Sequence, residues 1–234
     1  MKIRDIIAPI EEFAPLSLQE SYDNSGLIVG RLDDELQGGV LLAVDVTEAV
    51  IEEAIAKECG LIITHHPIIF HPLKRLNSAS VVERCVEMAI RNGIALYACH
   101  TNLDSTPNGM SWRVGEMLGL QGMKVLQPTA EGVGFGIVGE LPQAMSEVDF
   151  LKMVQTSFSV AALRHSELLG REVKRVAVCT GAGASLMRDA RASECDVYLT
   201  ADLKYNDFYT PDSRFVVVDM GHFESEFCAI AILF

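Results

Sequence analysis

The sequence lacks any run of about 18 uncharged apolar residues, the length that a helix needs to cross a bilayer. Its first segment, MKIRDIIAPIEEFAP, carries acidic residues among the apolar ones and therefore lacks the uninterrupted apolar core of a secretory signal. Basic residues are scarce, because 19 Lys and Arg stand against 32 Asp and Glu, a formal net charge of −13. Proteins that bind nucleic acids usually carry a basic footprint, so this charge argues against a nucleic-acid partner. We therefore expect a cytoplasmic protein with no membrane partner.

Closely paired cysteines are also absent. The six cysteines are widely spread and none forms a Cys-x-x-Cys pair. In a chain without an export signal, we expect them to be reduced and mostly buried thiols. Apolar residues make up 49% of the chain and charged residues 22%, values typical of globular proteins, which excludes intrinsic disorder. The 234 residues can form one large domain or two small ones.

Short apolar runs alternate with helical patterns along the chain. Strands are predicted at 40–46, 61–64, 94–99, 176–179, 196–200 and 215–219. Helices are predicted at 47–58, from Ser80 to a stop at Asn92–Gly93, from 146 onward and near 184–193, and a helical segment follows the last strand. Thr47 is a candidate N-cap, and Ser80 with Glu83 forms a capping box. This alternation predicts an α/β fold with mostly parallel sheets.

Two stretches of the sequence resemble each other at a constant offset. A shift of 136 residues aligns identical residues in the pairs Ala54/Ala190, Ala56/Ala192, Glu58/Glu194, Cys59/Cys195 and Thr64/Thr200. A shift of 122 residues places His100 and Asp104 on His222 and Glu226. Any two strand–helix units share some of this pattern, so duplication is one of two interpretations. We expect two related α/β lobes, residues 1–125 and 126–234.

Two adjacent histidines follow one of the predicted strands. His65 and His66 come directly after the apolar run 61–64, and Pro67 prevents the strand from continuing. The carboxyl ends of strands in α/β sheets form the ligand crevice. A lone histidine at such a place more often has a structural role, but each of two adjacent imidazoles needs its own partner. Successive side chains of an extended segment point in opposite directions, so the pair suits two metal ions better than one.

Two further motifs pair a histidine with a carboxylate four residues later. HTNLD contains His100 and Asp104, and GHFESE contains His222 and Glu226, each after a predicted strand. Either motif alone is also typical of a solvated helix face. Together with the histidine pair at 65–66 they indicate a metal site, whose imidazole and carboxylate donors suit Zn, Mn, Fe, Co or Ni rather than Ca. Carboxylates can bridge two such ions, an arrangement typical of hydrolytic sites.

Five segments together resemble one protein family, the Nif-three-like family. They are YDNSGLIVG, LLAVDVT, IITHHPIIF, ALYACHTNLD and DMGHFESE, at 22–30, 41–47, 62–70, 95–104 and 219–226. Members of this family are described as dinuclear metal-centre hexameric proteins or as GTP cyclohydrolase 1 type 2. The resemblance implies two α/β lobes with a metal site between them, a toroidal homohexamer, and two divalent transition-metal ions per subunit. The family's metal ligands match His65, His66, Asp104, His222 and Glu226.

The other candidate site residues are less specific. His100 matches a family position close to the metals, where it would orient a ligand or relay a proton. Asp45 and Asp202 end strands on the predicted metal face, and they either contact the site or cap helices. Asp23, Asn24 and Thr101 are candidates for substrate binding, although residues 23–26 equally fit an Asx turn.

The sequence departs from the family pattern in the second lobe. Ala201 replaces a glycine of a Thr-Gly-acidic block, and Asn206 stands where a histidine is common. The chain also stops at Phe234, short of the closing strand that we would expect. None of these departures removes a predicted metal ligand.

Two functions of different classes agree with these motifs. The first is a dinuclear metal-dependent hydrolase, similar to GTP cyclohydrolase 1 type 2, that acts through activated water on a nucleotide or phosphorylated small molecule. The second is a non-catalytic metal-binding hexameric ring with a scaffold or regulatory role. The two differ in whether the metals keep a coordination position open for water. The metal, the substrate and the catalytic acid or base stay open.

Overall fold

The computed structural model describes all 234 residues and divides into two compact units. Unit 1 comprises Met1–Thr106 and Ala229–Phe234, and unit 2 comprises Pro107–Cys228. The sequence analysis placed the boundary after residue 125, which lies inside a strand of unit 2. The difference arises because the helix at 110–117 and Leu120 join the apolar core of the second sheet. No helix combines the length and the apolar character needed to span a bilayer.

Unit 1 contains a four-stranded sheet of order β1-β4-β3-β2. The three strands β2, β3 and β4 are parallel, and β1 pairs with β4 in the antiparallel direction. The strands are β1 (Gly26–Val29), β2 (Gly39–Ala43), β3 (Cys59–Thr64) and β4 (Ala95–Ala98). The helices are α1 (Ile3–Phe13), the 3-10 turn η1 (Leu16–Leu18), α2 (Glu48–Ala56), α3 (Val81–Arg91), α4 (Thr101–Ser105) and α9 (Ala229–Leu233).

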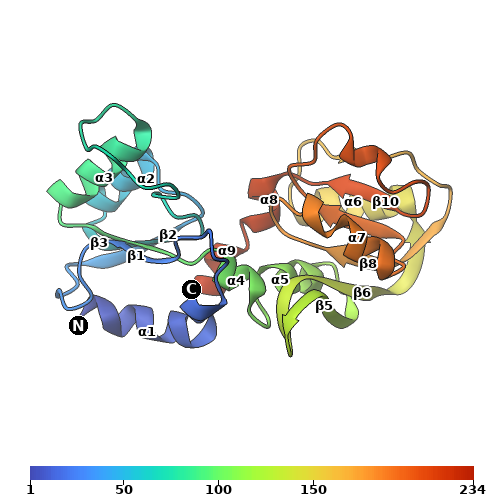
Figure 1. Cartoon of the computed structure of the whole chain (residues 1–234), viewed down its shortest axis with the longest axis horizontal. Coiled ribbons are helices and arrows are strands. Elements are labelled where there is room, and N and C mark those ends of the chain that lie inside the picture. The colour runs from blue at the N-terminus through green and yellow to red at the C-terminus, as the bar shows by residue number, and fades with distance from the viewer. The chain divides into compact units, whose positions relative to one another are not determined.

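Helices cover both faces of this sheet, with α2 and α3 on one face and α1 on the other (Figure 1). Ile51 of α2 and Ala89 of α3 pack with Ile62 and Leu96 of the central strands, all nearly inaccessible to solvent. Because both faces are covered, the strands are almost continuously apolar, which explains why the sequence reveals them so clearly.

Unit 2 contains a six-stranded sheet of order β5-β6-β8-β9-β10-β7. Its strands are β5 (Gln121–Ala130), β6 (Val133–Ser146), β7 (Arg164–His165), β8 (Glu172–Val178), β9 (Val197–Thr200) and β10 (Val216–Asp219). Its helices are α5 (Met110–Met117), α6 (Glu147–Ser157), η2 (Ala184–Leu186), α7 (Met187–Ala192), η3 (Asp207–Tyr209) and α8 (His222–Glu226). One face packs against α5 and α6, and the other packs against α7.

The expectation of mostly parallel sheets is wrong for unit 2. Strands β8, β9 and β10 are parallel, but the pairings β5–β6, β6–β8 and β10–β7 are antiparallel. The long strands β5 and β6 form a hairpin that the sequence analysis did not predict. Their glycines and exposed polar residues interrupt the apolar runs that identified the other strands.

The predicted helix starts are confirmed by hydrogen bonds. The side chain of Thr47 accepts from the N–H of Val50, Ser80 accepts from Glu83, and Ser146 accepts from Asp149. Each cap satisfies a backbone donor that the first turn of a helix leaves without a partner.

The internal repeat has a structural counterpart. The segment α2–β3 corresponds to α7–β9, and in each unit the strand joins a parallel group of three. Glu58 and Glu194, which the 136-residue offset aligns, both adopt a left-handed backbone, with φ of 55° and 56°. That conformation is uncommon for residues other than glycine, so its recurrence at the aligned position supports the duplication.

The burial of the cysteines generates a prediction about their reactivity. Burial raises the pKa of Cys99 to about 12 and that of Cys195 to about 12, whereas Cys59 is partly exposed at the start of β3. A raised pKa keeps the thiol neutral, with a thiolate fraction of roughly 10⁻⁴ at pH 8, and only the thiolate is nucleophilic. Iodoacetamide at pH 7 to 9 should therefore alkylate Cys59 well before Cys99 or Cys195, as peptide mass spectrometry would measure. Equal labelling of the three in the native protein would contradict this.

Candidate metal centre

Three of the predicted site residues of unit 1 follow the parallel strands at their carboxyl ends. His65 and His66 come directly after β3, and Asp45 follows β2, the neighbouring strand. The side chain of His65 is fully buried, and its Nδ1 lies 2.8 Å from the carbonyl oxygen of Cys99. A carbonyl oxygen only accepts hydrogen bonds, so Nδ1 of His65 carries the proton and Nε2 presents its lone pair.

His66 is oriented in the same way by a carboxylate. Its Nδ1 lies 2.8 Å from Oδ1 of Asp45, whose side chain is about half exposed. Asp104, on the short helix α4, places Oδ1 at 3.8 Å from Nε2 of His65. The two histidine rings lie close together, with centroids 5.0 Å apart. The alternation of side chains along a strand does not separate them, because the strand ends at Thr64.

His100 completes this group from the end of β4. Its ring centroid lies 5.3 Å from that of His65 and 5.4 Å from that of His66. One nitrogen from each of the three rings can be chosen so that all lie within 4.8 Å of one another, a spacing that could hold a metal ion.

A buried carboxylate fixes the ring of His100. Nδ1 of His100 lies 2.7 Å from Oδ1 of Asp23, whose side chain is inaccessible to solvent. Asp23 also accepts from the N–H and hydroxyl of Thr101 and from the hydroxyl of Ser25. Burial raises the pKa of Asp23, but the hydrogen bonds from His100 and Thr101 outweigh it and hold this pKa well below its usual range. Asp23 is therefore a carboxylate at neutral pH.

The remaining substrate-binding candidates have structural partners. Thr101 is buried, and its hydroxyl accepts from the N–H of Glu20 besides contacting Asp23. The side-chain amide of Asn24 donates to the carbonyl oxygen of Ile69 at 2.6 Å, which ties two loops together. Both residues thus hold the loop that presents Asp23.

In unit 2, the motif GHFESE places its two candidate ligands on one turn of α8. Nε2 of His222 lies 3.0 Å from Oε2 of Glu226, whose side chain is buried. Nδ1 of His222 lies 2.7 Å from Oδ2 of Asp202, a residue that follows β9. The hydrogen bond to Glu226 raises the pKa of His222 to about 9, against the opposing effect of burial and with help from Asp202. The ring shares a proton with Glu226, and a metal ion would take the place of that proton.

Gly181, after β8, makes room for Glu226. A Cβ at this position would lie 2.4 Å from Oε1 of Glu226, and the backbone φ is +63°. The N–H of Gly181 donates to the hydroxyl of Ser225 at 2.9 Å. The sequence analysis gave no role to Ser225, although it stands between the two candidate ligands of its motif.

The donor set fits divalent transition metals. In His65, His66, His100 and His222, Nδ1 lies 2.7 to 2.8 Å from an oxygen atom, so that Nε2 is the candidate ligand atom of each ring. This pattern of an oxygen acceptor behind the imidazole is typical of histidines that bind metals. Asp104 in unit 1 and Glu226 in unit 2 add a carboxylate to each group.

Comparison with known proteins places the chain in a family. The chain is 34% identical over its whole length to a GTP cyclohydrolase 1 type 2 homolog from Clostridium acetobutylicum, 88% of which is covered. It is 32% identical to NIF3-like protein 1 of Drosophila melanogaster, over 88% of this chain and 71% of that protein.

Solved structures show the same similarity. A Bacillus cereus protein related to NIF3 has a TM-score of 0.91 at 25% identity, over 96% of this chain and 89% of that one. Reduced HcgD from Methanocaldococcus jannaschii has a TM-score of 0.83 at 30% identity, over 99% of this chain and 91% of that one. The family model of Duf34/NIF3 (NGG1p interacting factor 3) matches residues 1–234, and the chain therefore belongs to the DUF34/NIF3 family.

Proposed function

We propose that the protein is a dinuclear metal-dependent hydrolase of the GTP cyclohydrolase 1 type 2 kind, acting on a nucleotide or another phosphorylated small molecule in the cytoplasm. The observation that carries this proposal is the shared orientation of four histidines, each with Nδ1 against an oxygen atom. The names of the curated relatives support the choice of reaction.

The proposed metal ligands are His65, His66, Asp104, His222 and Glu226. Unit 2 contributes one imidazole and one carboxylate, fewer than the three or four protein donors of an ordinary zinc site. We therefore propose that the donors of both units bind the same two divalent ions, which are Zn, Mn, Fe, Co or Ni. Lewis acidity and the activation of water are the chemistry that such a pair supplies.

The chain's own residues would orient the site and move protons. Asp45 and Asp202 accept from Nδ1 of His66 and His222 and thereby fix the orientation of each ring. Asp23 does the same for His100, which we propose exchanges a proton with the substrate through Nε2. A buried, ionised carboxylate behind an imidazole stabilises the protonated ring that such an exchange produces.

The alternative function is a non-catalytic metal-binding ring with a scaffold or regulatory role. The net charge of −13 favours it, because an acidic assembly collects cations. In both functions we propose a toroidal homohexamer. The functions differ in whether metal-loaded protein turns over a substrate.

The metal content of the protein tests the proposed ligands. Elemental analysis of purified protein should find roughly two transition-metal ions per subunit, and the content should fall in His65→Ala and in His222→Ala, because each loses an imidazole donor. His71→Ala serves as the matched control, since His71 is exposed on a loop. No retained metal in the wild type, even after reconstitution with each candidate ion, would refute the hydrolase.

The contact between Asp202 and Nδ1 of His222 gives a further prediction. Asp202→Asn should weaken metal affinity about 10- to 100-fold, because the amide is a poorer acceptor for Nδ1. Asp202 has a φ of 56°, a conformation that asparagine tolerates, so the backbone should persist. Asp212→Asn is the control, since Asp212 is exposed and has a φ of 50°. Equal metal affinity in the two variants, measured by competition with a chelator, would contradict the role of Asp202.

The reaction itself is tested with metal-loaded protein. GTP and phosphate esters should be turned over, and Asp23→Asn should lower kcat by roughly 100-fold or more while the metal content stays unchanged. Asp33→Asn, at an exposed ion pair with Lys2, is the matched control. Full metal loading without turnover of any substrate would favour the scaffold.

A further inference from the structure

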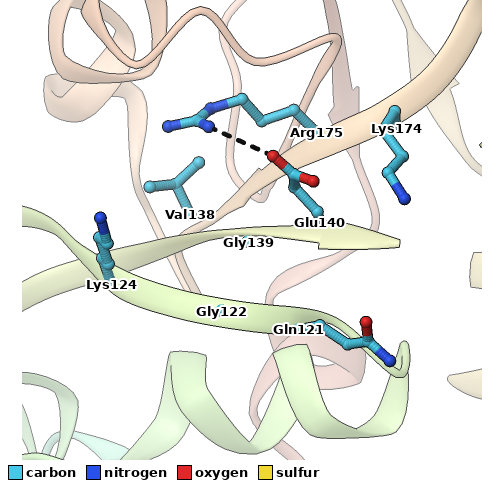
Figure 2. Close-up of a pocket in the computed structure, with 8 residues that line it drawn as sticks. All are labelled: Gln121, Gly122, Lys124, Val138, Gly139, Glu140, Lys174 and Arg175. Carbon is cyan, nitrogen blue, oxygen red and sulfur yellow. Dashed lines mark ion pairs between the residues drawn. The ribbon is translucent and has the colours of Figure 1, made fainter. Parts of the chain in front are cut away.

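A separate pocket lies beside the amino-terminal half of strand β8, whose carboxyl end leads to Gly181. It has a volume of about 260 Å³ and is lined by residues of β5, β6 and β8, among them Lys124, Glu140, Lys174 and Arg175 (Figure 2). We propose that this pocket binds the phosphate group of a small ligand. The proposal concerns a second site and does not depend on the proposed function.

A β-bulge brings Lys124 to the pocket. Gln121 pairs with Glu140 and Lys124 pairs with Val138, so that three steps along β5 match two steps along β6. In a regular ladder Met123 would face the pocket, because side chains alternate between faces. The extra residue, with Gly122 at a φ of +60°, turns Lys124 outward and leaves Met123 against the apolar core.

The register of the strands places Glu140 and Arg175 on the same face of the sheet as Lys124. Glu140 pairs with Arg175 across β6 and β8, and Glu140 stands two positions from Val138, so all of these side chains share a face with Lys124. Figure 2 shows Lys124 rising from β5 and Arg175 extending above Val138. Val138 and Gly139 also line the pocket, and Glu140 is its one carboxylate.

The cations of the pocket are incompletely paired. Nε of Arg175 is buried and has no hydrogen-bond partner, and its guanidinium meets Glu140 only at 3.7 Å. The side chain of Arg175 as a whole is 41% exposed, so its other guanidinium nitrogens can donate to an anion in the pocket. Lys124 takes part in no ion pair. Lys174 is different, because its ammonium donates to the carbonyl oxygens of Leu141 and Pro142.

The charged residues that line the pocket favour an anionic ligand. Three cations and one carboxylate line the pocket, a local charge of +2 in a chain whose total is −13. The neighbouring Asp196 does not line the pocket, and its Oδ2 accepts from the backbone N–H groups of Lys174 and Arg175. A guanidinium and an ammonium facing one small volume suit the several acceptor oxygens of a phosphate.

The pocket is distinct from the candidate ligands of unit 2. Strand β8 continues from Arg175 to Val178, about 10 Å of extended backbone, and Gly181 lies in the bend that follows. Gly181 is the residue that contacts Ser225 and makes room for Glu226. An anion bound in the pocket would therefore not contact the candidate metal ligands of unit 2.

Calorimetric titration with inorganic phosphate tests the proposal. Lys124→Ala and Arg175→Gln should each weaken binding roughly tenfold, the effect of losing one charge-assisted hydrogen bond. Glu140→Gln should strengthen binding, because it removes the only carboxylate of the lining. Lys152→Ala is the control, since Lys152 is exposed on α6. Equal affinity in wild type, Lys124→Ala and Arg175→Gln would overturn the proposal.

Chemical footprinting locates the anion without relying on a variant. Saturating phosphate should slow the acetylation of Lys124 by roughly tenfold and leave Lys152 unchanged. Protection by methyl phosphate as well would identify a phosphomonoester as the ligand, and protection by inorganic phosphate alone would identify the free anion. The protection should persist in His65→Ala, which separates this site from the metal centre. No protection of Lys124 by either compound would refute the pocket.

Discussion

The candidate metal centre depends on one recurring contact, a hydrogen bond between Nδ1 of a histidine and an oxygen atom fixed by the fold. Each contact needs an acceptor within about 3 Å of the ring, and the parallel strands supply the frame for it. The central strand β3 is nearly inaccessible to solvent along its apolar residues, so its end is rigidly placed. A buried imidazole such as that of His65 would be costly without such a partner. Orientation and stability of the site thus come from the same contacts.

The two units use this contact in the same way with different residues. In unit 1, Asp45 follows β2 and meets His66 at the end of β3. In unit 2, Asp202 follows β9 and meets His222 at the start of α8, after β10. In both cases the two strands are parallel neighbours in the sheet, so that their carboxyl ends bring acceptor and ring together. The two contacts are not at equivalent positions of the repeat, because the offsets of 136 and 122 residues align Asp202 with His66 and His222 with His100.

Much of the fold could be predicted from the sequence because the parallel strands are buried on both faces. Continuous apolar runs and the caps at Thr47, Ser80 and Ser146 marked these elements. The hairpin β5–β6 could not be predicted in the same way, since glycines and polar residues break its pattern. The motifs predicted His65, His66 and His100, which the fold brings together in one candidate metal-binding group. Three of the acceptors, Asp23, Asp45 and Asp202, were among the candidate residues, whereas the backbone carbonyl of Cys99 has no signal in side-chain type.

The two ends of strand β8 differ in charge, and the sheet explains why they can. The carboxyl end adjoins Glu226 and Asp202 with His222, whereas the amino-terminal half, which begins at Glu172, carries Lys174 and Arg175. About 10 Å of strand separates Arg175 from the carboxyl end at Val178, which exceeds the Debye length of roughly 8 Å at physiological salt, so exposed charges at the two places are largely screened from each other. Strand β8 can therefore support a proposed cation site near its carboxyl end and a proposed anion site beside its amino-terminal half. The bulge at Gly122 is what completes the second of these, because it alone turns Lys124 to the face of Arg175.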